Sequence, residues 1–370
     1  MKHLTFSIPC LFGLEGIVGN ECKRLNLANI KVENGRVLFD GDFEDMAKAN
    51  LWIRSGERVL IRLAEFPCRS FAELFDNVKA LPWEKFIPKD GAFPVKGYAL
   101  HSQLHSVPDC QSIIKKAVVE RLKEAYHLSW FAETGAKYQI QFGILNDVAG
   151  IYLDTSGAGL HKRGYRARAN DAPLRETLAA GMVDIAHYRG REVVYDPFCG
   201  SGTILIEAAM IAQNRAPGLY RRFAAESWHT SNDELWSSLR SDAKEKIFKR
   251  DFRLYGSDID DNALKIAMGN AAKAGVAQYV KFRNCDVLKW KPESDTGIVI
   301  TNPPYGERLL DVQKAEALYR TLGQVMRRNP DFPTYIISSH QELPRLYGRN
   351  PTKRRKLYNG MIKCEYYMYY

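Results

Sequence analysis

The spacing of apolar residues divides the first 65 residues into alternating strand-like and helix-like runs. Apolar residues recur at helical spacing over 14–25 and 43–54, which predicts two amphipathic helices. Asn34-Gly35 stands between two β-rich runs and predicts a two-residue hairpin. The predicted strands are HLTFSIP (3–9), IKVEN (30–34), GRVLFDG (35–41) and ERVLIRLAEF (57–66). The resulting order of strand, helix, strand, strand, helix, strand is typical of a ferredoxin-like unit.

A second α/β segment extends from residue 66 to about residue 157. Its predicted elements are helices over 70–81 and 110–126 and strands over 93–100, 138–145 and 148–157. Asn146-Asp147 predicts a hairpin between the last two strands. Lys115 and Lys116 lie on or near the polar side of the second helix. They either contact phosphate groups or form an ordinary solvated face.

Beyond residue 158 apolar strands alternate with helices, which indicates a mostly parallel sheet with crossover helices. The predicted strands are EVVYDP (192–197), FRLYGSDI (252–259), YVKFRNCD (279–286), GIVITNPP (297–304) and PTYIISSH (333–340). Asn359-Gly360 predicts a terminal hairpin, so the sheet is expected to be Rossmann-like with seven strands. The segment 215–249 makes the second connection longer than a simple crossover, and we interpret it as a helical insert.

Composition restricts the class of protein. Of the 370 residues, 45% are apolar and 26% are charged, as in ordinary soluble globular domains. No apolar run approaches the ~20 residues that span a bilayer, so no membrane association is expected. The seven cysteines form no CxxC pair. This argues against a disulfide framework and against a metal site, and favours a reducing cytoplasm.

The net charge of +10 makes a polyanionic partner plausible. Basic residues cluster in HKRGYRAR (161–168), NRAPGLYRR (214–222) and RNPTKRRK (349–356), although any one cluster could be a solvated surface. The candidates for contact with nucleic-acid phosphates are Lys115, Lys116, Lys162, Arg163, Lys353, Arg354 and Arg355.

Acidic residues and glycines follow the predicted parallel strands, where open α/β sheets bind ligands. Gly200 and Gly202 lie in a strand–turn–helix run, DPFCGSGT, that lacks the third glycine of a dinucleotide fingerprint and the lysine of a P-loop. Asp196, Asp258 and Asp286 each end a strand. Any one aspartate could be a helix cap, but three in succession outline an adenosyl ligand, with Asp258 on the ribose and Asp286 near the adenine amine.

The stretch ITNPPYGERL places Asn302, Pro303, Pro304 and Tyr305 directly after the fourth strand. The prolines exclude helix and predict a stiff, extended loop. An Asn oxygen and a fixed carbonyl can accept both N–H groups of an exocyclic amine, and the tyrosine ring offers a surface on which an extruded base can stack.

With DPFCGSGT, SDID, NCD and NPPYGERL in this order, residues 160–370 resemble the class I S-adenosylmethionine-dependent methyltransferases that modify exocyclic amines of bases. With GLHKRGYR and APLRETLAA added, the chain is similar to the bacterial 23S rRNA guanine-N2 methyltransferase group, in which a THUMP domain precedes the catalytic domain. The resemblance implies a ferredoxin-like domain (1–65), a THUMP-like RNA-binding domain (66–157) and a methyltransferase domain (158–370). It implies S-adenosylmethionine as cofactor, bound by Asp196, Phe198, Gly200, Ser201, Gly202, Asp258, Ile259 and Asp286.

Other functions stay open at this point. NPPY-type loops also serve adenine-N6 methylation, and a tRNA could replace rRNA as the substrate. A non-catalytic RNA-binding or assembly protein is the remaining alternative. Only 65 residues follow Tyr305, so target recognition is expected in the N-terminal half. RNA is therefore the favoured partner, with rRNA ahead of tRNA.

Overall fold

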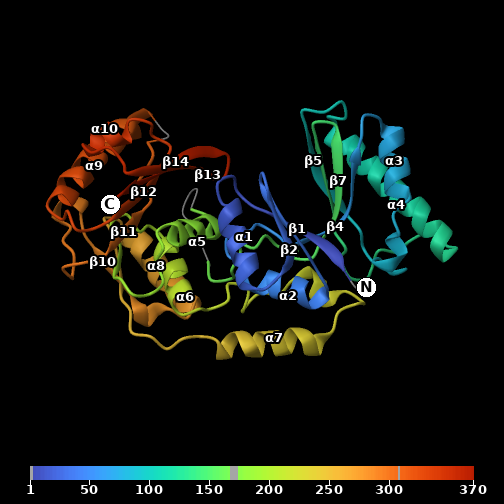
Figure 1. Ribbon diagram of the computed structural model, residues 1–370, viewed down its shortest axis with the longest axis horizontal. Helices are drawn as coiled ribbons and strands as arrows, with labels where there is room; N and C mark the ends of the chain where they lie inside the picture. The colour runs from blue at the N-terminus through green and yellow to red at the C-terminus, as the bar shows by residue number, and fades with distance from the viewer. Residues whose placement is uncertain (1–2, 167–173, 307–308) are drawn as a thin grey trace.

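The computed structural model describes residues 3–166, 174–306 and 309–370. Arg168 of the first basic cluster, residues 172–173 of the APLRETLAA run and residues 307–308 of the NPPYGERL run lie outside the described residues. Figure 1 shows three modules side by side along the longest axis. The first module (residues 3–65, blue) lies between the second (66–157) and the third (158–370).

The first two modules share one seven-stranded sheet, with the strand order β2-β3-β1-β4-β7-β6-β5. Its strands and the adjoining helices are β1 (Leu4–Pro9), α1 (Glu15–Arg24), β2 (Ala28–Glu33), β3 (Arg36–Gly41), α2 (Phe43–Trp52), β4 (Leu60–Pro67), α3 (Phe71–Lys79), the 3₁₀ turn η1 (Trp83–Lys85), β5 (Val95–Leu100), α4 (Val107–Tyr126), β6 (Ile140–Leu145) and β7 (Val148–Asp154). The βαββαβ order expected for a ferredoxin-like unit is confirmed. β4 pairs antiparallel with both β1 and β7, so the expected domain boundary after residue 65 falls inside a continuous sheet.

The third module is the expected seven-stranded Rossmann-like sheet, with the strand order β10-β9-β8-β11-β12-β14-β13. Its elements are α5 (Glu176–Ile185), β8 (Val194–Asp196), α6 (Thr203–Ala212), η2 (Ala224–Ser227), α7 (Asp233–Glu245), β9 (Leu254–Asp258), α8 (Asp261–Lys273), η3 (Ala277–Tyr279), β10 (Val280–Asn284), η4 (Val287–Lys289), β11 (Ile298–Thr301), α9 (Leu309–Arg327), β12 (Thr334–Ser338), α10 (Leu343–Tyr347), β13 (Lys353–Asn359) and β14 (Ile362–Tyr369). α5, α6 and α8 pack on one face of the sheet, and α9 and α10 pack on the other.

Short local signals determine the turns and helix starts. The three predicted hairpins all form, and their strands close with Glu33 opposite Arg36, Leu145 opposite Val148, and Asn359 opposite Ile362. Asn146 and Asp147 both have positive φ, as the favoured two-residue hairpin turn requires. The side chains of Asp42 and Ser70 form capping boxes at the starts of α2 and α3, where free backbone N–H groups need acceptors.

The helical insert returns to the first two modules. It contains η2 and α7, and α7 runs along the lower edge of the molecule in Figure 1. The side chains of Phe223, Trp228, Trp236 and Leu239 are buried in the same apolar cluster as the core of the first two modules. Trp228 stacks on Tyr138 of the second module, with ring centroids 4.9 Å apart. The insert therefore links the third module to the N-terminal half of the chain.

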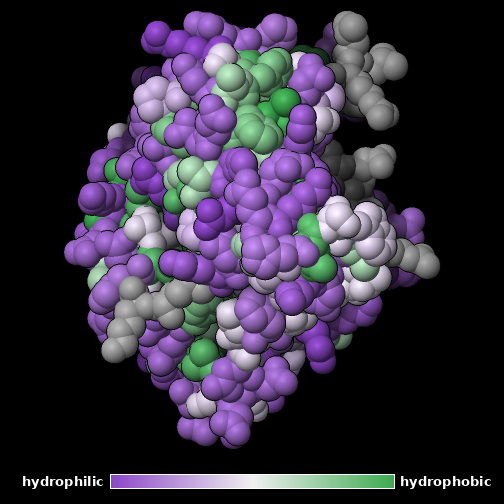
Figure 2. Space-filling model, turned by 90° about the vertical axis from the view of Figure 1, so that its right-hand side faces the viewer, coloured by the Kyte–Doolittle hydropathy of each residue, from purple (hydrophilic) through white to green (hydrophobic). Residues whose placement is uncertain are grey.

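The end of the molecule formed by the second module has a largely hydrophilic surface, interrupted by apolar areas (Figure 2). Its exposed apolar side chains include Tyr98, Leu100, Leu145 and Val148, on β5 and the hairpin beside it. Among the described residues, no helix is long and apolar enough to cross a membrane.

Candidate active site

The predicted site residues meet at one edge of the third module's sheet. β10, β9, β8 and β11 are consecutive parallel strands, so their carboxyl ends lie together. Asp196 ends β8, Asp258 ends β9, and Asn302 directly follows β11. The structure thus brings together the glycine turn, the strand-end aspartates and the NPPY loop.

The glycine turn leaves its backbone open to a ligand. Gly200 has φ +50°, and a Cβ added there would meet no atom within 4 Å. At Gly202, with φ +80°, a Cβ would approach the Phe282 ring at 3.0 Å, so a side chain there would be strained. The buried Asn270 amide donates to the Ser201 carbonyl over 3.1 Å, which fixes the turn from behind.

Asp258 holds this turn in place. Its Oδ2 accepts from the Gly200 N–H at 2.9 Å, and its Oδ1 accepts from the Asp260 N–H at 3.0 Å. Beside it the Ile259 side chain is 70% exposed, which leaves an aliphatic surface on which an adenine ring could lie. Phe198 is half-buried at the start of the same turn.

Asp286 is exposed, and its carboxylate accepts from the Leu288 N–H as the cap of η4. The open glycine backbone, the exposed Ile259 and the strand-end carboxylates fit an adenosyl cofactor. Among the residues that the structure describes, no group of three or more His, Cys, Asp or Glu side chains is arranged to hold a metal ion.

Asp196 is fully buried between the cofactor turn and the NPPY loop. Its Oδ1 accepts from the Thr301 hydroxyl at 2.6 Å and from the Phe198 N–H at 3.2 Å. Burial raises the pKa of Asp196 from its ordinary 3.8 to about 7, and the charge of Asp258 adds to the shift. Through Thr301, the end of β8 is tied to the strand that carries Asn302.

The NPPY loop is held from two sides. The Tyr305 hydroxyl donates to Asn302 Oδ1 at 2.6 Å, and the Tyr319 hydroxyl of α9 donates to the Pro304 carbonyl at 2.7 Å. Tyr319 also contacts Ser338 of β12 at 3.0 Å, and the Pro303 side chain is buried. The Tyr305 ring packs against the apolar layer under α5, and burial raises its pKa well above the usual range. In this arrangement Tyr305 orients the Asn302 amide; stacking of a base on its ring stays a prediction.

Two of the residues predicted to contact phosphate form ion pairs within the fold. Arg163 is buried, and its guanidinium donates to Glu207 at 3.3 and 3.4 Å and to the Leu160 carbonyl at 2.6 Å, so it holds the chain onto α6. Lys115 is paired with Glu133 at 2.5 Å and lies 3.5 Å from the centroid of the Phe93 ring. Each charge is therefore paired within the fold, and contact of either residue with RNA stays a prediction.

The other basic candidates are more accessible. Lys116, Lys162, Lys353 and Arg354 are exposed, and Arg355 is half-buried. Lys116 extends over the Phe75 ring with its amine 6.0 Å from the centroid. Lys116 lies on α4, Lys162 lies between β7 and α5, and the other three lie on β13. Their contact with RNA stays a prediction.

Sequence reasoning missed the residues that support the site. These are Thr301, Tyr319, Ser338, Asn270 and Arg166, whose guanidinium donates to the Thr203 hydroxyl at 2.9 Å. Thr301 could have been found, since it adjoins NPPY and ends a buried strand. Tyr319 and Ser338 carry no local signal, because they reach the loop only through tertiary packing.

Comparisons with known proteins identify the family. The family model described as "RMKL-like, methyltransferase domain" matches residues 163–368, the RlmL ferredoxin-like domain matches 5–60, and the THUMP domain matches 68–154. The "Putative RNA methyltransferase YpsC" of Bacillus subtilis (strain 168) is 42% identical over 100% of this chain and 97% of its own length. The ribosomal RNA large subunit methyltransferase K/L of Psychromonas ingrahamii is 35% identical over 98% of this chain, which spans about half (49%) of that relative.

Solved structures agree with this assignment. SMU.472, solved in complex with SAH, superimposes with a TM-score of 0.94 at 38% identity, covering 100% of this chain and 98% of the other. A Listeria monocytogenes protein described as a predicted N6-adenine-specific DNA methylase gives a TM-score of 0.94 at 43% identity, covering 100% and 97%. The chain therefore belongs to the RMKL-like family of THUMP-containing class I RNA methyltransferases, and its methyl donor is S-adenosylmethionine.

Proposed function

We propose that this protein methylates the exocyclic amine of an RNA base, and that the base is a guanine of 23S rRNA modified at N2. The observation that carries the proposal is the Asn302 amide, which is locked by the Tyr305 hydroxyl at the strand edge that also carries the glycine turn. Thr301, the residue before Asn302, is tied directly to Asp196 of the cofactor turn.

The fixed NPPY loop can compensate for the low nucleophilicity of an exocyclic amine. The lone pair of an exocyclic amine is delocalised into the base, which makes the nitrogen a poor nucleophile. Asn302 Oδ1 has a second lone pair beyond the one used by Tyr305, and the Pro303 carbonyl points from a backbone that two prolines restrict. Together they can accept hydrogen bonds from the two N–H groups of the amine and favour a pyramidal nitrogen. These acceptors are in place before charge develops in the transition state, which is electrostatic preorganisation.

S-adenosylmethionine supplies the methyl group when it is bound. The residues that would hold it are the Gly200–Gly202 backbone, Asp258 and the exposed Ile259 surface. No strong base is required, since the amine proton becomes acidic after methylation and can leave to water. Alignment of the two reacting groups then provides much of the rate.

The choice of RNA follows from the N-terminal half and from the relatives. The RlmL ferredoxin-like domain covers residues 5–60, and the THUMP domain covers residues 68–154. YpsC is named as an RNA methyltransferase, and the K/L relative is named for the large ribosomal subunit. Because the chain matches only half of K/L, the rRNA target and guanine-N2 are inferences for this chain.

Nucleoside analysis tests the proposal. RNA and DNA from a deletion strain, and from strains complemented with wild-type protein, Asn302→Ala or the surface control Asn77→Ala, are hydrolysed and compared by mass spectrometry. We expect N2-methylguanosine in 23S rRNA to be lost on deletion, and to be restored by the wild type and by Asn77→Ala but not by Asn302→Ala. Loss of a methylated adenine from DNA, or of a methylated guanine from tRNA only, would overturn the assigned substrate. Unchanged modification in all nucleic acids would overturn the activity itself.

A further inference from the structure

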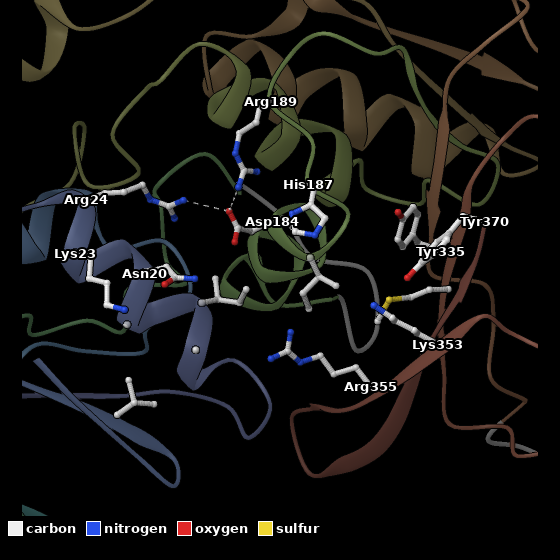
Figure 3. A pocket seen from close by; sticks show the side chains of 16 residues that line it. Asn20, Lys23, Arg24, Asp184, His187, Arg189, Tyr335, Lys353, Arg355 and Tyr370 are labelled. Carbon is white, nitrogen blue, oxygen red and sulfur yellow. Dashed lines mark hydrogen bonds and ion pairs between the residues drawn. The ribbon is translucent and has the colours of Figure 1, made fainter.

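A basic groove of about 1040 Å³ lies between the first and third modules (Figure 3), and no residue of the glycine turn lines it. Its walls come from α1, from the C-terminal end of α5 with the residues that follow it, and from β13 and β14. Its charged lining consists of five cations (Lys23, Arg24, Arg189, Lys353 and Arg355) and one carboxylate, Asp184, with His187 beside them.

The single carboxylate does not neutralise the groove. Asp184 lies 2.8 Å from an Arg189 nitrogen and 3.5 Å from an Arg24 nitrogen, so one negative charge is shared by two guanidinium groups. For Lys23, Lys353 and Arg355, no described carboxylate lies within 4.0 Å of the charged nitrogens. Figure 3 shows the Arg355 guanidinium projecting into the groove between α1 and β13. Positive charge collected on both sides of a concave surface attracts a polyanion.

The alternation of β13 determines which cations face the groove. Lys353, Arg355 and Leu357 share one face of the strand, and Leu357 is buried in the apolar layer under α5. Arg354 and Lys356 project from the opposite face, where Arg354 pairs across the sheet with Tyr367 of the layer under α9. Two Lys–Arg pairs of equal charge therefore occupy opposite faces of one strand.

The groove also lies on the same side of the sheet as part of the NPPY loop. Tyr305 packs against the α5 layer, and so does Tyr335, which lines the groove. Tyr335 on β12 is three residues before Ser338, which meets the Tyr319 anchor of the NPPY loop. Three residues of strand measure about 10 Å, which is the span along β12 between Tyr335 and Ser338.

We propose that this groove binds the phosphate backbone of the RNA substrate outside the active site. The inference rests on the proposed function for the identity of the polyanion as RNA. The Gly16 and Gly19 positions keep α1 narrow at the groove wall, and the exposed rim residue Tyr370 offers a ring beside the phosphates. The first module then contributes directly to substrate binding through Lys23 and Arg24, instead of serving only as a spacer before the THUMP domain.

The matched pairs on β13 test the inference. Lys353→Glu/Arg355→Glu reverses the groove-facing charges, and Arg354→Glu/Lys356→Glu reverses the same number of charges on the other face. For Arg354, the inference replaces the RNA contact predicted from the sequence. A protein-free 23S rRNA transcript is titrated against both double variants and the wild type at several salt concentrations. We expect the groove variant to bind at least about tenfold more weakly at 0.15 M salt, with a salt slope reduced by about 2, and the control to bind nearly as the wild type does.

Other outcomes would overturn the inference that the groove binds RNA. Equal weakening by both pairs would mean that only net charge matters, and stronger weakening by the control would assign the contact to the other face. Displacement of the RNA by low-millimolar inorganic phosphate would indicate a small-anion site. Thermal stability and S-adenosylmethionine affinity are measured in parallel; if the Glu pair unfolds, Lys353→Gln/Arg355→Gln decides by the same criterion. Because binding is read without methylation, a wrong assignment of guanine-N2 leaves this test intact.

Discussion

At the scale of single residues, the hydrogen bond from Tyr305 to Asn302 changes the expected role of the tyrosine. From the sequence, the ring is the part that matters, as a surface on which a base can stack. In the structure the hydroxyl lies 2.6 Å from Asn302 Oδ1 and the ring is half-buried in the apolar layer under α5. The hydroxyl therefore selects one orientation of the amide that faces the amine.

Tyr305→Phe tests this positioning role. Loss of one neutral hydrogen bond is worth about 0.5–1.5 kcal/mol, so we expect single-turnover methylation to slow by roughly 2- to 13-fold. The affinity for S-adenosylmethionine should not change, because no cofactor residue is touched. Tyr98→Phe, at an exposed tyrosine of the second module, is the matched control. A normal rate in Tyr305→Phe would show that the hydroxyl does not orient Asn302 during the reaction.

The buried Asp196 predicts an unusual pH dependence of stability. Its pKa is raised from 3.8 to about 7 in the folded protein, so the folded state binds a proton that the unfolded state has released between these values. The stabilisation of the folded state by the proton on Asp196 is fully present below about pH 4 and is lost as the pH rises towards 7. Asp196→Asn, which stays neutral, should lose this part of the slope and gain stability relative to the wild type at pH 8.

Melting temperatures of the cofactor-free proteins between pH 4 and pH 9 check this expectation. Thr301→Val removes a hydrogen bond that lowers the pKa of Asp196, so it should extend the pH-dependent window above 7. Parallel melting curves for wild type and Asp196→Asn across the whole range would contradict the raised pKa.

At the scale of elements, the sequence is most informative where a short local signal decides the geometry. Asn34-Gly35, Asn146-Asp147 and Asn359-Gly360 each predict a hairpin, and each hairpin forms. The order of parallel strands alone places Asp196, Asp258 and Asn302 at one edge of the sheet. The surroundings of a single charge are not local: nothing near Arg163 in the chain reveals Glu207, which lies 44 residues away on α6.

Arg163 and its neighbour Lys162 separate a structural role from an RNA-binding role. Removing one partner of a buried ion pair leaves an uncompensated charge, so Arg163→Ala should destabilise the protein by about 3–5 kcal/mol. Lys162→Ala, at an exposed position, should leave the melting temperature unchanged. Denaturant unfolding of both variants provides the measurement. An Arg163→Ala protein of wild-type stability with weakened RNA binding would restore the original interpretation of this cluster.

At the scale of the whole molecule, the three modules are not independent packing units. β4 belongs to a sheet shared by the first two modules, and residues Leu14 and Ile17 of the first module are buried in the core of the third. The insert then packs Trp228 and Trp236 into the core of the N-terminal half. This destination could not be predicted from the sequence, because the amphipathic pattern of α7 shows only that one face is buried and not against which partner.

Trp236→Ala tests whether the insert couples the modules. Trp236 is 4% exposed and stacks on Phe223 with ring centroids 5.5 Å apart, so its truncation should cost about 3–5 kcal/mol. If the modules unfold as one unit, amide hydrogen exchange by global opening should accelerate to a similar extent in α4 of the second module and in β8 and β9 of the third. Trp130→Ala, at a side chain that is 75% exposed, should change neither. Acceleration of exchange confined to α7 would show instead that the insert opens alone and that the modules are energetically independent. The loss of stability caused by Trp236→Ala would then affect only the segment that contains the substitution.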